Sequence, residues 1–169
     1  MKNTFTNLSV APLIRTFNPI FLTGFSGSGK SSKGAFLAKK YQKNFIDLDN
    51  YIVEKNNKTI SEIFENEGEQ EFRKLEHNAL KEISALKNSI VATGGGTPCF
   101  FDNMTLMNKS GVTIFLKTSV ETLFKRLVSD KKSRPLLAGK SDDEILEYIK
   151  KELKMREKFY NMAQYAIFT

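Results

Sequence analysis

Residues 24–31, Gly24-Phe25-Ser26-Gly27-Ser28-Gly29-Lys30-Ser31, decide the fold of this chain. They match the phosphate-binding pattern G-x-x-x-x-G-K-[ST] at every defining position. The apolar run 19–23 before them predicts a strand, and residues 32–41 behind them predict a helix. Strand, glycine turn and helix form the setting in which this pattern binds a polyphosphate, so we expect a nucleoside triphosphate here.

The glycines of this loop allow a tight turn and leave room for phosphate groups. Backbone N–H groups then point inward at the positive end of a helix dipole. Lys30 supplies a cation for the β- and γ-phosphates, and the Ser31 hydroxyl a ligand for Mg²⁺. The alternative is a glycine-rich turn without a ligand. The predicted nucleotide-binding residues of the loop are Gly27, Ser28, Gly29, Lys30, Ser31 and Ser32.

Length and composition place the chain among globular proteins with one domain. It has 169 residues, of which 40% are hydrophobic and 27% are charged. No apolar run approaches the roughly 20 residues that a membrane-spanning helix needs. Cys99 is the single cysteine, which excludes an internal disulfide, and no secretory signal is seen in residues 1–18. We therefore expect a cytoplasmic protein without a membrane partner.

The net charge of +7 arises from 26 Lys and Arg against 19 Asp and Glu. Such a balance suits either a nucleic-acid partner or a solvated lysine-rich surface. The charges are dispersed along predicted helices, and no signature of a DNA- or RNA-binding module is present. The sequence favours the solvated surface and predicts no nucleic-acid partner.

Asp47 and Asp49 end a second short apolar run, Asn44 to Asp49. On a strand, residues i and i+2 share a face, so both carboxylates are expected to point into one space. In a parallel sheet this end is also where the glycine loop lies. One carboxylate could then hold Mg²⁺ through water, while the other accepts a proton from an attacking hydroxyl. The alternative is that Asp49-Asn50 caps the next helix.

The middle of the chain predicts helices that flank the sheet. Thr59 to Glu62 has capping-box form and starts a helix that Gly68 closes. A longer helix follows from Glu69 to about Leu86, with His77 on its solvated side.

Gly94-Gly95-Gly96 directly follows the apolar strand 89–93 and offers a second close approach of backbone to a ligand, or a flexible turn. The charged segment 129–140 is typical of loops that close over bound phosphates. A long helix from Ser141 to about Met162 carries Arg156 and Tyr160 one turn apart.

Together these residues resemble the shikimate kinases, members of the P-loop nucleoside monophosphate kinase-like group. The likeness covers about residues 20–169 and leaves out the N-terminal extension. It rests on motifs in the family's order: Gly24–Ser31, Asp47-Leu48-Asp49, Gly68-Glu69 with Phe72-Arg73 and Glu76, Gly94-Gly95-Gly96, Arg134-Pro135-Leu136-Leu137, and Arg156. The resemblance implies ATP- and Mg²⁺-dependent phosphorylation of the 3-hydroxyl of shikimate, toward chorismate and the aromatic amino acids. Phosphorylation of another polyol acid, such as gluconate, is the alternative.

The resemblance also implies roles around the transferred phosphoryl group. Lys30 matches the loop lysine, and Ser31 and Asp47 match the metal ligands, with Asp47 acting through water. Asp49 matches the group that hydrogen-bonds the acceptor hydroxyl, as general base or as positioning group. Arg134 matches the lid arginine that reaches the phosphoryl group.

For the substrates, Arg73 and Arg156 with the backbone of Gly95 and Gly96 match the contacts to the shikimate ring and its carboxylate. Arg126 matches an arginine that stacks on adenine.

The fold implied is a three-layer α/β domain, with a five-stranded parallel sheet in the order 2-3-1-4-5 flanked by helices. We expect an extension over residues 1–18, either loose or packed, and a single P-loop kinase domain over 19–169 that acts as a monomer. Within it, about 50–86 forms the shikimate-binding part and about 129–140 the lid.

Overall fold

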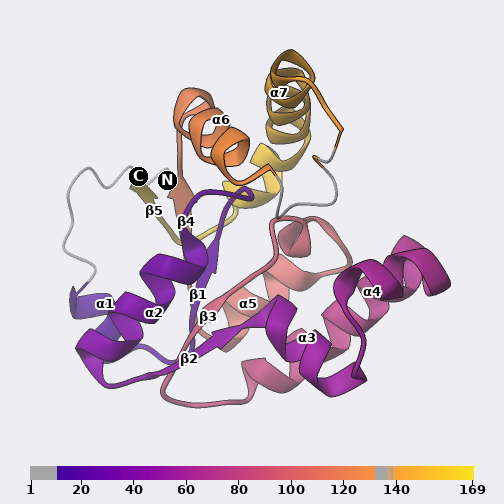
Figure 1. Ribbon diagram of the computed structural model, residues 1–169. Helices are drawn as coiled ribbons and strands as arrows, with labels where there is room; N and C mark the ends of the chain where they lie inside the picture. The colour runs from indigo at the N-terminus through magenta and orange to yellow at the C-terminus, as the bar shows by residue number, and fades with distance from the viewer. Residues whose placement is uncertain (1–10, 132–136, 138) are drawn as a thin grey trace.

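A five-stranded parallel sheet in the order β2-β3-β1-β4-β5 forms the centre of the molecule (Figure 1). The computed structural model describes residues 11–131, 137 and 139–169. The sheet order confirms the predicted 2-3-1-4-5 arrangement. The strands are β1 (Ile20–Thr23), β2 (Asn44–Asp47), β3 (Ser89–Ala92), β4 (Val112–Lys117) and β5 (Tyr165–Phe168).

Helices connect the strands and cover the sheet. In the described part of the chain they are α1 (Ala11–Thr16), α2 (Lys30–Tyr41), α3 (Leu48–Asn56), α4 (Ile60–Ser84), α5 (Asn103–Ser110), α6 (Val120–Ser129) and α7 (Asp142–Tyr160). A short 3-10 turn, η1 (Thr97–Cys99), follows the three glycines.

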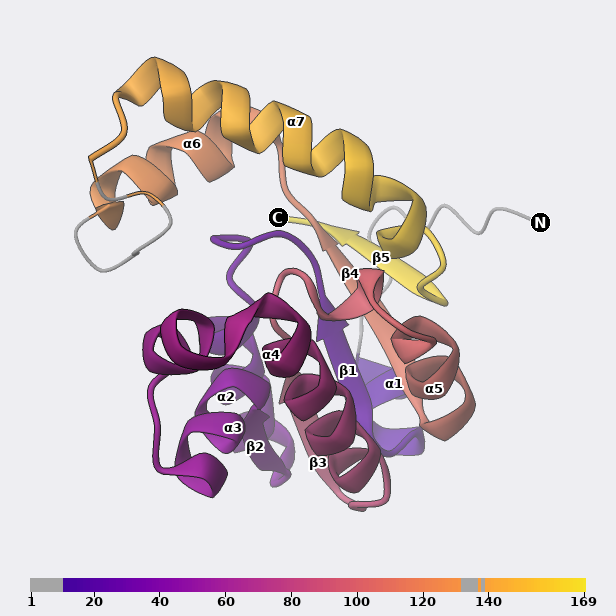
Figure 2. The ribbon, with the colours of Figure 1, turned by 90° about the vertical axis from the view of Figure 1, so that its right-hand side faces the viewer.

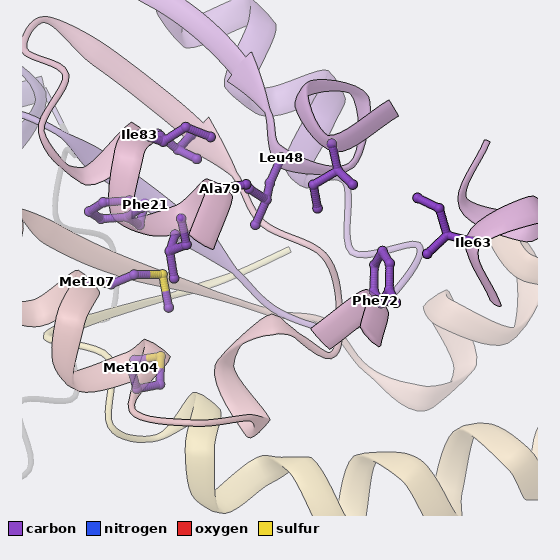
Figure 3. Close-up of a cluster of buried hydrophobic side chains, with 11 residues drawn as sticks. Phe21, Leu48, Ile63, Phe72, Ala79, Ile83, Met104 and Met107 are labelled. Carbon is purple, nitrogen blue, oxygen red and sulfur yellow. The ribbon is translucent and has the colours of Figure 1, made fainter. Parts of the chain in front are cut away.

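Alternation along the strands divides the core into two layers. On β1, Ile20 and Leu22 belong to one cluster and Phe21 to the other. The first cluster packs against α1 and α2, and the second against α3, α4 and α5. Figure 3 shows the second cluster, where Phe21 lies among side chains of α4 and α5 such as Ile83 and Met107. Both faces of β1 are buried, as expected for a central parallel strand.

A third cluster joins α6 and α7 to the end of the sheet. It contains Phe25 of the glycine loop, Phe115 of β4, Leu127 of α6 and Tyr160 of α7, all of them buried. In Figure 2, α6 and α7 lie together above the sheet, and the last turns of α7 lead down to β5. This packing brings α7 close to the glycine loop.

The structure corrects the prediction for Asp49. Strand β2 ends at Asp47, and Asp49 lies in the first turn of α3. The Asp47 side chain accepts hydrogen bonds from the N–H groups of Asp49 and Asn50, so Asp47 caps the helix. The two carboxylates therefore meet across a strand-to-helix junction rather than on one strand face.

Helix α4 contains the break predicted at Gly68. The capping box at Thr59 is present. Gly68 has non-helical angles, φ 81° and ψ 168°, so the helical segment that starts after Thr59 closes there and a second segment follows, as predicted. The predicted pair of helices is therefore confirmed: the kink at Gly68 separates the two helical segments that together make up α4.

Of the predicted extension, the described residues form α1. Ile14 of this helix is fully buried against the sheet and α2, so this part of the segment is packed. Residues 1–10 lie outside the described range. None of the helices in the described residues has both the length and the apolar character needed to cross a membrane.

Candidate active site

The glycine loop opens into a cavity of about 530 Å³ at the carboxyl ends of the strands. The described residues that line it include most of those predicted for the nucleotide: Gly27, Gly29, Lys30, Ser31, Ser32 and Arg126, together with Asp47 and Asp49. Ser129 and Asp130 of the predicted lid also line it, as do Lys33 and Thr93, which the sequence did not single out.

Within the loop, Ser28 and Lys30 are both turned inward. Ser28 is fully buried and does not line the cavity, and its N–H donates to the carbonyl of Phe25. Lys30 is buried as well, and its Nζ donates to the carbonyl oxygens of Gly24 (2.7 Å) and Phe25 (2.9 Å). The loop therefore binds its own lysine, and a phosphate ligand would have to take over these contacts.

Arg126 reaches the loop from α6. Its Nη1 donates to the carbonyl of Gly27 at 3.0 Å. The guanidinium therefore forms part of the cavity wall beside the loop.

Two oxygen ligands suited to Mg²⁺ lie together in the same cavity. The Ser31 hydroxyl donates to Asp47 Oδ2 at 2.6 Å, which brings residues 16 positions apart in sequence into direct contact. Magnesium prefers oxygen ligands and takes only one or two protein groups when phosphates and water supply the rest. This hydroxyl and carboxylate fit that requirement.

A second cavity of about 290 Å³ adjoins the first. Its lining mixes arginines with aromatic and aliphatic side chains, and Ser26, Asp49, Gly94 and Gly95 line both cavities. The described residues that line only the second cavity are Ile60, Phe64, Phe72, Arg73, Glu76, Gly96, Leu127, Leu137, Tyr148 and Arg156.

Arg73 is held in place by two carboxylates and an aromatic ring. Its Nη1 donates to Glu76 at 2.9 Å and its Nη2 to Glu69 at 3.1 Å. Its guanidinium carbon lies 4.0 Å from the centre of the Phe100 ring. Glu76 is almost fully buried and also accepts from the Thr97 hydroxyl, so the guanidinium is fixed from behind.

Arg156 approaches from the opposite side, on α7. It pairs with Glu152 one turn earlier, and its guanidinium carbon lies 5.5 Å from the centre of the Phe25 ring. A Cβ on Gly95 would lie 3.6 Å from Arg156 Nη1, and one on Gly96 would lie 2.8 Å from Arg73 Nη2. The two guanidinium groups therefore converge on adjacent glycines.

Asp49 stands where the two cavities meet. Burial, followed by the nearby charges of Glu76 and Asp47, raises the pKa of Asp49 from 3.8 to about 6, against the opposing effect of Lys30 and Arg73. A carboxylate with such a pKa is ionised at neutral pH and more basic than an exposed aspartate.

His77 does not lie on the solvated side of its helix, contrary to the prediction. Its side chain is 14% exposed, its ring stacks on Phe101, and its Nδ1 lies 2.6 Å from Asn103 Oδ1. Asn103 is fully buried and donates through Nδ2 to the carbonyl of Thr97. Because that amide group is the donor to Thr97, its oxygen is the acceptor and His77 carries the proton on Nδ1.

Sequence reasoning also missed the part that Glu76 and Asn103 take in holding the turn after the glycines. The contacts that place them join distant segments: Thr97 to Glu76 spans 21 residues, and His77 to Asn103 spans 26. Contacts between residues so far apart in sequence leave no local sequence pattern from which they could be predicted. Arg134 and half of the predicted lid, residues 132–136 and 138, lie outside the described residues.

Comparison with known proteins gives one family. A family model described as Shikimate kinase matches residues 26–169. The shikimate kinase of Bacteroides thetaiotaomicron is 48% identical over 146 residues, which cover 86% of this chain and 83% of that protein. The shikimate kinase of Flavobacterium johnsoniae is 43% identical over 150 residues, covering 88% and 87%.

Solved structures agree. The 1.7 Å crystal structure of shikimate kinase from B. thetaiotaomicron superposes with a TM-score of 0.87 at 46% identity, over 90% of this chain and 87% of that one. Shikimate kinase from Acinetobacter baumannii, solved in complex with shikimate, gives a TM-score of 0.82 at 35% identity, over 94% and 87%.

Proposed function

The chain belongs to the shikimate kinase family, and from that membership we propose how its own residues carry out the reaction. The protein phosphorylates shikimate with ATP, a step of chorismate and aromatic amino acid biosynthesis. The observation that carries the residue roles is the pair of adjoining cavities, one built on a phosphate loop and the other on two converging arginines.

In the first cavity, the loop holds the phosphates of ATP. Gly27, Gly29 and Ser32 supply backbone and hydroxyl contacts, and Lys30 exchanges its carbonyl contacts for the β- and γ-phosphates. The buried N–H of Ser28 already has an acceptor, so its part is to hold the loop's shape. Arg126 covers the adenine.

Ser31 and Asp47 would hold Mg²⁺, Ser31 directly and Asp47 through water. The bound ion would neutralise charge on the phosphate oxygens. In the described structure the Ser31 hydroxyl donates to Asp47, so the two groups that would hold the ion already lie side by side.

In the second cavity, Arg73 and Arg156 bind the carboxylate and ring of shikimate together with the backbone of Gly95 and Gly96. Guanidinium forks match a carboxylate better than ammonium groups do. Glu76 limits the free movement of Arg73 and so pre-organises it.

Asp49 then meets the 3-hydroxyl of shikimate at the boundary of the two cavities. It accepts a hydrogen bond from this hydroxyl, either taking its proton as general base or orienting it toward the phosphoryl group. Its raised pKa suits both roles at neutral pH. Lys30 and Arg134 supply cations for the charge that spreads over the transferred group.

We further propose that residues about 50–86 form the shikimate-binding part of a single P-loop kinase domain over 19–169, with about 129–140 as the lid. Support comes from α4, which supplies five lining residues of the acceptor cavity, and from Ser129, Asp130 and Leu137, which line the two cavities from the lid side. A single chain lines both cavities, which favours an active monomer. The single cysteine favours the cytoplasm.

The test is a coupled assay of ADP release with Mg²⁺ and ATP, run with shikimate and with gluconate. We expect release that depends on shikimate and none that depends on gluconate. ADP release that depends on gluconate and not on shikimate would mean that gluconate, or a related polyol acid, is the acceptor. Salt-sensitive binding to DNA or RNA without turnover would instead favour a basic nucleotide-binding protein.

A further inference from the structure

Tyr160 reaches the wall between the two cavities although it lines neither of them. It is the last residue of α7 and is fully buried. Its hydroxyl donates to the carbonyl oxygen of Gly95 at 2.7 Å, across 65 residues of sequence. The hydrogen bond therefore ties α7 to the glycine turn at one of the residues that line both cavities.

This bond fixes the orientation of one peptide unit. In a planar trans peptide, the C=O of one residue and the N–H of the next point in opposite directions. With the Gly95 carbonyl turned to Tyr160, the N–H of Gly96 is directed the other way, and Gly96 lines the acceptor cavity. Within the described part of the chain, this N–H has no protein acceptor.

The remainder of the turn is anchored elsewhere. The Thr97 carbonyl accepts from Asn103, and the Thr97 hydroxyl donates to Glu76. A Cβ on Gly95 would lie 3.1 Å from the backbone nitrogen of Ser26, so the phosphate loop limits the space on that side. The bond from Tyr160 is thus the polar anchor at Gly95 itself.

The surroundings of Tyr160 keep its hydroxyl in place and protonated. Its ring stacks on Phe115 with 5.1 Å between ring centres. Burial raises the pKa of Tyr160 well above its ordinary value, so the hydroxyl remains a donor across the working range of pH. Arg156 lies on the same helix four residues earlier, so one rigid element sets two contacts to the acceptor.

We propose that Tyr160 is a positioning residue for shikimate: by holding the Gly95 carbonyl from α7, it aims the Gly96 N–H at an oxygen of the acceptor. This inference rests on the acceptor site proposed above. Helix α7 then has two roles at the acceptor cavity: it presents the Arg156 guanidinium, and through Tyr160 it orients the Gly96 N–H.

The test is Tyr160→Phe, which removes the hydroxyl and keeps the ring. Loss of one buried hydrogen bond should raise the KM for shikimate about five- to tenfold and leave the KM for ATP within about twofold. The matched control is Tyr41→Phe, which removes a tyrosine hydroxyl at the C-terminal end of α2, where the residue lines neither cavity, and should change neither constant. An unchanged KM for shikimate, or an equal rise in both constants, overturns the proposal.

A second measurement remains decisive if Tyr160→Phe fails to fold. With 3-fluorotyrosine placed at position 160, the ¹⁹F signal should shift on addition of shikimate and stay unchanged with ADP alone. A signal that ignores shikimate overturns the proposal. Failure of the proposed function gives a different result. If the unmodified protein releases no ADP with shikimate, the assigned acceptor is wrong, independently of the role of Tyr160.

Discussion

At the scale of single residues, Lys30 has the clearest expected effect. Lys30→Ala removes the cation that stabilises charge on the transferred phosphoryl group, so kcat should fall by about 10²- to 10³-fold. The coupled ADP assay measures it. Lys39→Ala, an exposed lysine of the same helix, should leave kcat unchanged. Turnover of Lys30→Ala close to that of the unmodified protein would contradict the role given to this lysine.

Asp49 should set the acid limb of the pH profile. Its carboxylate must be ionised to accept from the hydroxyl, so kcat/KM for shikimate should fall about tenfold per pH unit below pH 6, near the pKa of about 6. Asp49→Asn should abolish this limb along with most of the activity. An acid limb that persists unchanged in the variant would assign it to another group.

The same pKa shift predicts a change in stability. Folding raises the pKa of Asp49 from 3.8 to about 6, so its favourable contribution is complete below pH 3.8 and is lost as the pH rises through 6. Asp49→Asn removes this loss of stability, because an asparagine at this position cannot ionise. Relative to the unmodified protein, the variant should gain about 1–3 kcal/mol in free energy of unfolding between pH 4 and pH 8, measured by urea titration. No gain would mean that Asp49 is better solvated than its position indicates.

Arg73 combines binding with stability. Arg73→Ala should raise the KM for shikimate at least about tenfold with the KM for ATP unchanged, because only the acceptor cavity loses its cation. It also leaves buried Glu76 without its counter-charge, which should cost about 3 kcal/mol of stability.

The double variant Arg73→Met with Glu76→Gln separates these two effects, since it removes both charges. It should fold better than Arg73→Ala and still bind shikimate weakly. Loss of ATP affinity with intact shikimate binding would place the acceptor elsewhere.

Sequence predicted the residues whose placement is local. Lys30 and Ser31 follow from the loop pattern, since seven neighbouring positions set their geometry. Glu76 and His77 owe their surroundings to Thr97 and Asn103, which the sheet brings close from more than 20 residues away. No spacing rule contains such contacts.

At the scale of elements, the bend in α4 shapes the acceptor cavity. Phe64 lies before Gly68 and Phe72 after it, yet their ring centres are 4.6 Å apart. Gly68→Ala meets no atom within 4 Å, so its cost of about 1–3 kcal/mol would come from the backbone angles alone. We expect a lower Tm and a raised KM for shikimate, whereas Asn66→Ala, an exposed neighbour, should change neither.

The element boundaries also show why Asp49 was placed on a strand. Apolar residues 45, 46 and 48 read as a strand through Asp49, but the Asp47 side chain accepts from two N–H groups and starts α3 one residue earlier. An aspartate at a strand end followed by polar residues is a cap signal, and here the cap outweighed the apolar alternation. The predicted function of both carboxylates was unaffected, because the junction faces the same cavity.

At the scale of the whole molecule, α1 extends the core beyond the kinase motifs. Ile14 is buried against β1, β3 and β4 residues, so Ile14→Ala should cost about 2–4 kcal/mol in free energy of unfolding. Phe17→Ala, at a site 42% exposed, should cost far less. Urea unfolding of the two variants compares them. Equal small losses would mean that α1 contributes little to the folded state. The sequence did not decide whether this segment is packed, because several of its partners lie on β3 and β4, far along the chain.

The two cavities share one wall, formed by Ser26, Asp49, Gly94 and Gly95, and this has a thermodynamic consequence. If a bound nucleotide changes the mobility or charge of this wall, it also changes the affinity for shikimate in the other cavity. Shikimate then changes the affinity for the nucleotide by the same factor. The factor by which a non-hydrolysable nucleotide tightens or loosens shikimate binding must equal the factor by which shikimate alters the nucleotide's own dissociation constant.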